Sequence, residues 1–235
     1  MSFSRRQIVE GGAAAAAIGF MASSPLLAAV IDPRRRPDMA PAAPAPTALI
    51  AQATVPARPR VMVDPSLDPR IVTRARAAFD RHRAQIRHPE LVGIVDFSKM
   101  SGDQRFYLLD TNTGRVTRHF VSHGRGSDPS HTGLLQRFSN QYGSEASSNG
   151  AYLIGDYYHG RYGRSMRVRG LDHSNSNAEG RAIVVHTAWY AEPEVISQNG
   201  RLGRSEGCFA LPNRSHQEVM ARLGPGHFLY ADRVA

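Results

Sequence analysis

Seven short segments rich in β-branched and aromatic residues follow one another from Leu91 onward, and they constrain the fold more than any other feature. Loops rich in Gly, Ser, Asn and His separate them. The segments are LVGIVDF (91–97), RFYLLD (105–110), RVTRHFVS (115–122), AYLIGDYY (151–158), SMRVRG (165–170), RAIVVHTAWY (181–190) and HFLYAD (227–232). Many strands with few helices predict a mostly β fold with minor helices, in which mainly antiparallel strands form a sandwich or barrel.

Two helices are predicted beside these strands. The first begins at Asp68-Pro69, an acidic N-cap followed by proline, and ends at His88-Pro89. The second runs from about Ser215 to Leu223, with Gly224 as its C-terminal stop. The segment Thr111–Gly114 has the composition of a hairpin turn between two predicted strands.

The first thirty residues have the features of a bacterial export signal. Arg5 and Arg6 form a twin-arginine pair, a weakly apolar Gly/Ala run extends from Gly11 to Phe20, and small residues near Ala28 offer a cleavage site. The apolar run is too short and too rich in alanine to favour a membrane-spanning helix. We therefore expect residues 1–30 to be a twin-arginine-type signal. The protein is expected in the periplasm or cell envelope, with only transient membrane contact during export.

Residues 31–65 form a Pro/Ala-rich stretch with almost no large apolar side chains. Such a segment cannot bury enough surface to fold, so we expect an extended linker. The remaining residues, 66–235, are expected to form one folded domain of ordinary size.

The charge balance is basic, with 29 Lys+Arg against 20 Asp+Glu and a net charge of +9. No basic run is interleaved with aromatic residues, as a nucleic-acid groove requires, so no nucleic-acid partner is expected. The histidines do not follow H-E-x-x-H or similar ligand spacing. We therefore expect no metal ion and no other cofactor.

Cys208 is the only cysteine, so no intrachain disulfide can form. A lone cysteine often packs as a small buried hydrophobe. Here it follows Gly207 in a turn of small residues, and His186 ends the apolar segment RAIVVH. A thiol nucleophile needs a base that takes its proton and backbone N–H groups that stabilise an oxyanion. Cys208 and His186 meet these needs, and Gly207 lets the backbone approach a substrate closely.

Around these residues the sequence resembles the L,D-transpeptidase catalytic domain (YkuD-like) family, and within it the murein L,D-transpeptidase branch. The family pattern is His, a spacer, then Ser/Thr-x-Gly-Cys, and it matches His186 followed by Ser205-Glu206-Gly207-Cys208. The resemblance extends over roughly Asp68 to Asp232. Other segments that carry it are 94–98, 122–127, 138–140, 143–148 and 163–167. It implies that residues 66–235 are a catalytic domain with the L,D-transpeptidase-type β-sandwich or barrel.

The resemblance implies a cysteine-dependent acyltransferase that acts on peptidoglycan stem peptides. Cys208 is expected to attack an L,D-peptide bond, while His186 takes the thiol proton and later protonates the leaving D-alanine. An amine of a neighbouring stem then resolves the thioester. The N–H of Cys208, with Gly207 nearby, is expected to form the oxyanion hole, and the carbonyl of Thr187 to orient His186. Carbapenems are expected to acylate the thiol.

Several further residues are candidates for substrate binding. Arg204 suits a bidentate contact with a substrate carboxylate. Trp189 lies in the long segment between the histidine and the motif, which is a candidate lid. His123 and Tyr158 are candidates for lining the cleft, as is His159.

Two departures from the wider family bear on these contacts. Glu206 stands where the family often has histidine, and Phe209-Ala210-Leu211 stands where an arginine commonly follows the cysteine. They leave open which substrate contacts carry over, and Ser205 and Gly207 remain part of the matched motif.

Two alternative functions stay open, and two others conflict with the sequence. The alternatives from the same fold are an L,D-carboxypeptidase, with water as acceptor, and a non-catalytic peptidoglycan-binding module. The stretch Gly203–Gly207 also fits G-x-S-x-G, but no Asp/Glu and His follow in the order that a serine hydrolase needs, and the chain is built of hairpins. A penicillin-binding-protein type of site needs S-x-x-K, whereas Lys99, the single lysine, follows Asp96 at that spacing.

Overall fold

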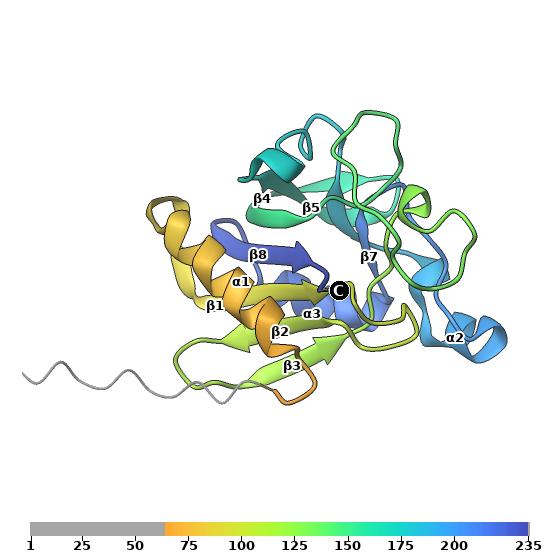
Figure 1. Cartoon of the computed structure of the whole chain (residues 1–235), viewed down its shortest axis with the longest axis horizontal. Coiled ribbons are helices and arrows are strands. Elements are labelled where there is room, and N and C mark those ends of the chain that lie inside the picture. The colour runs from red at the N-terminus through yellow and green to blue at the C-terminus, as the bar shows by residue number, and fades with distance from the viewer. Residues whose placement is uncertain (1–63, 235) are drawn as a thin grey trace, which may run out of the picture. The chain divides into compact units, whose positions relative to one another are not determined.

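The computed structural model describes residues 64–234 (Figure 1). The predicted export signal at 1–30 lies outside the described residues, as does the predicted linker up to residue 63. The elements are α1 (Pro69–Arg81), η1 (Arg83–Gln85), β1 (His88–Asp96), β2 (Phe106–Asp110), β3 (Val116–His119), η2 (Arg125–Ser127), β4 (Gly150–Gly160), β5 (Gly163–Gly170), η3 (His173–Asn175), β6 (Val184–Thr187), η4 (Trp189–Ala191), α2 (Pro193–Asn199), β7 (Phe209–Leu211), α3 (Asn213–Arg222) and β8 (His227–Asp232). Within this range no helix is both long and apolar enough to cross a bilayer.

Eight strands in the described range form one sheet, in the order β3-β2-β1-β8-β4-β5-β6-β7. Most neighbours are antiparallel, while β1 pairs with β8 and β6 pairs with β7 in parallel. The predicted hairpin joins β2 to β3, with Leu109 opposite Val116. The prediction of a mostly β fold with mainly antiparallel strands and minor helices is confirmed.

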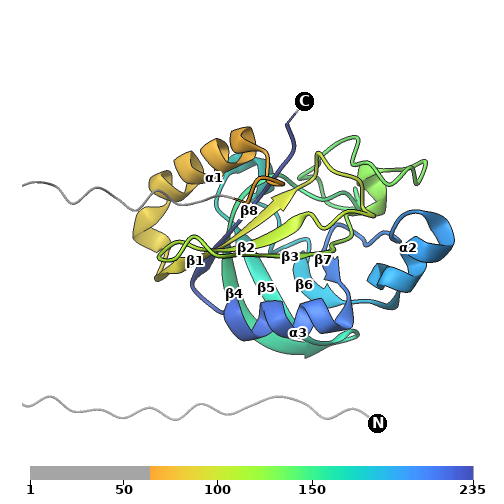
Figure 2. The same cartoon turned by 90° about the horizontal axis from the view of Figure 1, so that it is seen from below.

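Helices α1 and α3 cover opposite faces of the sheet (Figure 2). Successive strand residues point to opposite faces, so one strand serves both apolar layers. In β1, for example, Ile94 packs in the cluster that holds Ile71 of α1, whereas Val95 packs in the cluster that holds Val219 of α3. Strand β1 is therefore buried on both sides from Leu91 onward.

Helix α1 begins as predicted but ends earlier. The Asp68 carboxylate accepts a hydrogen bond from the Arg70 N–H at 2.8 Å, and Pro69 occupies the first turn. The sequence predicted one helix up to residues 88–89, whereas α1 stops at Arg81. His82, the C-cap, contacts Asp172 through its Nε2 at 2.8 Å. This contact with a distant loop accompanies the break and explains why helical periodicity alone misplaced the end.

A short segment after β3 joins the two ends of the sheet. The Ser122 N–H donates to the Ala210 carbonyl of β7 at 2.8 Å, and the Arg125 N–H donates to the Ser205 carbonyl at 2.8 Å. The Ser205 N–H in turn donates to the His123 carbonyl at 2.9 Å. These bonds hold the turn before β7, at one edge of the sheet, against the segment that follows β3, the strand at the other edge.

The Arg105 side chain lies in the interior, at 0% exposure, beneath this junction. Its guanidinium donates to the carbonyl of Val121 at 2.9 and 3.1 Å, to the carbonyl of Lys99 at 2.9 Å and to His123 Nδ1 at 2.8 Å. Burial lowers the pKa of Arg105 to about 9. The bonds to Val121 and His123 are buried, so removal of the guanidinium leaves these acceptors without their partner in the interior.

Replacing Arg105 with alanine is therefore expected to lower the free energy of unfolding by about 3 kcal/mol. Urea denaturation of the wild-type and variant proteins measures this difference. Arg115→Ala, which removes an exposed arginine from the β2–β3 hairpin, is the matched control and should change stability by less than about 0.5 kcal/mol. Equal stabilities of the two variants would contradict the structural role of the buried guanidinium.

Candidate active site

His186 lies in β6 with its side chain almost entirely buried, at 2% exposure. Its Nδ1 lies 2.8 Å from the Thr187 carbonyl, and only a protonated nitrogen can donate there. This bond assigns the proton to Nδ1 and leaves the lone pair on Nε2, which a general base requires. Burial lowers the pKa of His186, and the Thr187 bond opposes that change in part. The imidazole is therefore neutral at pH 7.

Cys208 stands directly before β7 and is half-buried. In the parallel pairing of β6 with β7, His186 lies opposite Ala210. Ala210 comes two residues after Cys208 in the chain, so this register brings the strand that carries His186 next to the turn that carries Cys208.

The turn that carries Cys208 needs glycine and is held by Ser205. Gly207 has φ +112°, and a Cβ there would stand 2.8 Å from the Ala146 carbonyl oxygen. The Ser205 hydroxyl donates to the Cys208 carbonyl at 2.7 Å and accepts from the Gly207 N–H at 3.2 Å. Ser205 therefore shapes the turn, with its proton committed to a backbone carbonyl.

The thiol of Cys208 is not activated at rest. Its Sγ contacts the Ala182 carbonyl oxygen at 3.6 Å. The pKa of Cys208 is raised to about 11, mainly by burial and also by the Glu206 carboxylate, while the Val184 backbone and the Arg181 cation act in the opposite direction. The cysteine is accordingly a neutral thiol at pH 7, and the His186 imidazole is neutral as well.

Arg181 is a residue of the site that the sequence did not single out. Its guanidinium donates to the Ser139 and Ala146 carbonyls and to the hydroxyls of Ser144 and Ser148, at 2.5 to 3.1 Å. It therefore fastens the 139–148 loop next to the cysteine. Arginine is abundant in this chain, so residue type alone gave no signal.

Two tyrosines also lie near the candidate residues: Tyr162, which the sequence did not single out, and Tyr190, which belongs to the segment predicted as a candidate lid. Tyr162 stacks on His186, with ring centroids 4.3 Å apart and an interplanar angle of 23°. Burial raises the pKa of Tyr190, and the neighbouring Tyr162, Cys208 and Glu206 add to this effect. Tyr190 thus remains a neutral phenol near the thiol. Their positions come from the β4–β5 hairpin and from η4, whose approach to β6 only the fold defines.

The predicted substrate-binding residues occupy different environments. The Thr187 carbonyl orients His186, as expected from the family resemblance. Arg204 donates to the carbonyls of Asp128 and Pro129 in the neighbouring loop. Trp189 is 78% exposed at the start of η4, in the segment that also contains α2.

His123 and Tyr158 lie outside the segment that contains η4 and α2. The His123 side chain is 1% exposed and contacts Arg105 and Asp128, so its backbone carbonyl, and not its imidazole, reaches the cysteine turn. Tyr158 lies on β4 with the Arg167 guanidinium 4.5 Å from its ring centroid. A pocket next to His186 is lined by Tyr162 and Thr187, and by His216 and other residues of α3. Cys208 is not among its lining residues.

Comparison with known proteins identifies this type of domain. A family model described as "L,D-transpeptidase catalytic domain" matches residues 63–231. No curated protein gives a match.

Several solved structures are similar at low identity. The L,D-transpeptidase LdtMt1 in complex with imipenem shares 15% identity over 61% of this chain and 59% of that chain, with a TM-score of 0.37. L,D-transpeptidase 3 from Mycobacterium tuberculosis, in complex with a faropenem-derived adduct, shares 13% over 61% and 60%, with a TM-score of 0.40. The helical cell shape determining protein Pgp2 from Campylobacter jejuni shares 14% over 64% and 49%, with a TM-score of 0.41. The matches span about half to three fifths of those chains.

The position of Glu206 leads to a test of the thiol environment. Glu206→Gln removes a carboxylate that raises the pKa of Cys208, so the pKa should fall and alkylation by iodoacetamide at pH 8.5 should become faster. The pH dependence of the alkylation rate, followed by mass spectrometry, measures the shift. Glu194→Gln, an exposed acid on α2, is the control and should leave the rate unchanged. An unchanged or slower rate in Glu206→Gln would contradict the described electrostatics.

Proposed function

The chain belongs to the L,D-transpeptidase catalytic domain family, and we propose on this basis that it joins peptidoglycan stem peptides, with Cys208 as nucleophile and His186 as general base. One observation carries the assignment of these roles. His186 has its Nδ1 proton held by the Thr187 carbonyl, and its neighbour in the β6–β7 register, Ala210, comes two residues after the half-buried Cys208. A non-catalytic binding module has no need of a base in that tautomer beside a thiol.

The first half-reaction forms an acyl-enzyme. Sγ of Cys208 bonds to the carbonyl carbon of the L,D-peptide bond while Nε2 of His186 takes the thiol proton. The C–N bond then breaks, and the imidazolium returns the proton to the departing D-alanine amine. In the second half-reaction the acceptor amine attacks the thioester, the C–S bond breaks, and His186 passes the amine proton back to the sulfur.

The raised pKa of the thiol defines the protonation state from which the proposed reaction starts. Both partners are neutral at rest, so His186 acts as a base during attack, and no preformed thiolate–imidazolium pair is required. The Sγ contact with the Ala182 carbonyl has to be given up by rotation about χ1 when the proton passes to Nε2. We assign this rotation to substrate binding.

The surrounding groups suit a peptide substrate. The Cys208 N–H is our candidate oxyanion donor, since the Gly207 N–H already donates to Ser205. The exposed Trp189 and the neutral Tyr190 phenol are candidates for contacting the stem, and Arg204 remains a candidate for a substrate carboxylate. We further propose export by the twin-arginine-type signal and action in the periplasm or cell envelope.

The acceptor distinguishes two related activities. An amine acceptor gives transpeptidation, and water gives L,D-carboxypeptidation through the same thioester. We favour the amine because the half-buried thiol limits access of bulk water.

Variants at the two proposed catalytic residues test the assignment. Cys208→Ala should abolish acyl transfer while keeping the circular dichroism spectrum, and His186→Ala should lower the rate roughly 10²- to 10⁴-fold.

Incubation with tetrapeptide stems, followed by mass spectrometry, reports crosslinked dimers for a transpeptidase, tripeptides for a carboxypeptidase and unchanged stems for a binding module. A carbapenem adduct is expected on Cys208. Turnover by Cys208→Ala would contradict the proposed mechanism with Cys208 as nucleophile.

The stacked Tyr162 provides a test of the base. Burial lowers the pKa of His186, so the acidic limb of kcat/KM should have its midpoint below 6.5 in the wild-type enzyme. Tyr162→Ala exposes the imidazole, which should raise this pKa and move the limb to higher pH. Tyr142→Ala, which removes a 65% exposed tyrosine from a loop, is the control. A limb that stays in place in Tyr162→Ala would argue against His186 as the titrating base.

A further inference from the structure

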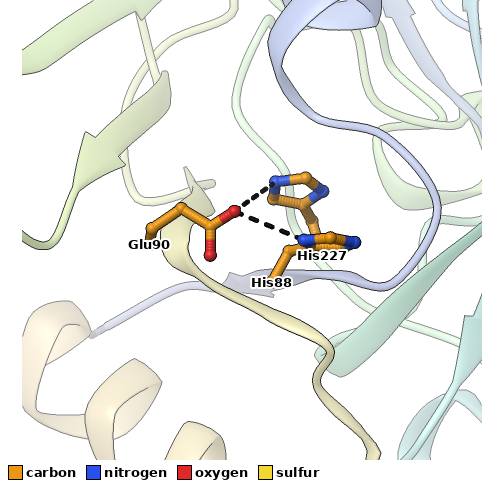
Figure 3. A group of neighbouring side chains, drawn as sticks. All are labelled: His88, Glu90 and His227. Carbon is orange, nitrogen blue, oxygen red and sulfur yellow. Dashed lines mark ion pairs between the residues drawn. The ribbon is translucent and has the colours of Figure 1, made fainter.

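A second group of chemically active side chains lies where β1 and β8 begin. It consists of His88, Glu90 and His227, and Figure 3 shows both imidazoles directed at one carboxylate. His88 and Glu90 are two residues apart on β1, so they point to the same face. His227 starts β8 and is the direct neighbour of His88 in the parallel register. Strand alternation and register together gather the three side chains.

The distances suit a shared ligand. Oε1 of Glu90 lies 3.3 Å from Nδ1 of His88 and 3.9 Å from Nε2 of His227. The ligand atoms of the group all lie within 4.8 Å of one another. The two rings stack with centroids 4.9 Å apart and an interplanar angle of 21°. Both nitrogens therefore approach the same oxygen from similarly oriented rings.

The orientation of His227 is set by the turn before β8. Its Nδ1 lies 2.8 Å from the Gly224 carbonyl oxygen, and the Gly224 N–H points at the same nitrogen at 3.1 Å. These two contacts hold the ring so that Nε2 faces the Glu90 carboxylate. Backbone groups that orient an imidazole in this way are typical of metal-binding histidines.

We propose that His88, Glu90 and His227 bind one divalent transition-metal ion of the Zn²⁺ type. Bonds of 2.0–2.1 Å in tetrahedral geometry put neighbouring ligand atoms about 3.3–3.4 Å apart. The His88–Glu90 pair already has this separation, the His227–Glu90 pair exceeds it by about half an ångström, and the two histidine ligand atoms lie within 4.8 Å of each other. Two imidazoles with one carboxylate favour Zn²⁺, Ni²⁺ or Cu²⁺ over Mg²⁺ and Ca²⁺, which prefer oxygen ligands.

Exposure and position fit a site that is separate from the thiol. The His88 and Glu90 side chains are 48% and 49% exposed, so an ion and a completing water have access. Strands β1 and β8 lie in the middle of the sheet order, whereas Cys208 precedes the edge strand β7. A bound ion would tie two strands from distant parts of the chain and stabilise the fold without taking part in acyl transfer.

Metal binding to untagged protein tests this site. The Cys208→Ala variant serves as the background, because it removes the only thiol that could compete for the ion. Equilibrium dialysis against Zn²⁺ should give one bound ion per chain, and Zn²⁺ should raise the melting temperature, whereas Mg²⁺ should not. Adding Glu90→Gln or His88→Ala should weaken Zn²⁺ binding at least tenfold. Adding His159→Ala, at an exposed histidine of β4, should not.

A spectroscopic readout separates loss of ligands from loss of fold. Co²⁺ bound in place of Zn²⁺ should give visible absorption bands of a nitrogen- and oxygen-ligated ion, and these bands should vanish in Glu90→Gln while the circular dichroism spectrum stays unchanged. Absence of Zn²⁺ binding in the background variant would overturn the proposal. Binding that persists in Glu90→Gln and His88→Ala would overturn it equally.

Discussion

The parallel pairing of β6 with β7 is the interaction on which the candidate site depends. It sets His186 opposite Ala210 and so brings the strand that carries the imidazole next to the turn that carries Cys208. The Ser122–Ala210 bridge then ties β7 to the segment that follows β3. Because backbone hydrogen bonds define the register, a slip of one residue would change which residue of β7 lies opposite His186.

A buried polar network lies beneath this pairing. Arg105 binds the Val121 and Lys99 carbonyls and the His123 ring, and the His123 carbonyl receives the Ser205 N–H. The cysteine turn is therefore connected to the core through backbone groups. This arrangement gives His123 a supporting position, in which its imidazole is neutral because burial lowers its pKa to about 3.

The electrostatics of Cys208 and His186 favour the neutral form of both side chains in the absence of substrate. Burial keeps the thiol protonated and the imidazole neutral, and Glu206 strengthens the first effect. A neutral thiol is protected from unwanted alkylation and oxidation, since the thiolate is the reactive form. The Arg181 cation, fixed by four contacts to the 139–148 loop, is the neighbouring group that favours the thiolate.

Much of the fold followed from local sequence. Alternation and composition located every strand of the described range except β7, which is only three residues long. Thr111–Gly114 located the hairpin, and Asp68-Pro69 located the start of α1, because turn preferences and caps are properties of neighbouring residues. The single cysteine, the preceding glycine and the histidine at a strand end were also visible in the sequence, as candidates. The end of α1 was not, because His82 contacts a loop ninety residues away.

The sequence alone therefore determined the strand-rich class, the family and the candidate reactive residues. Only the tertiary structure decided what surrounds them: Tyr162 on His186, Arg181 beside the thiol, and His227 next to His88. Those contacts join residues far apart in the chain, and they arise from strand register and burial, which no local pattern of residues specifies.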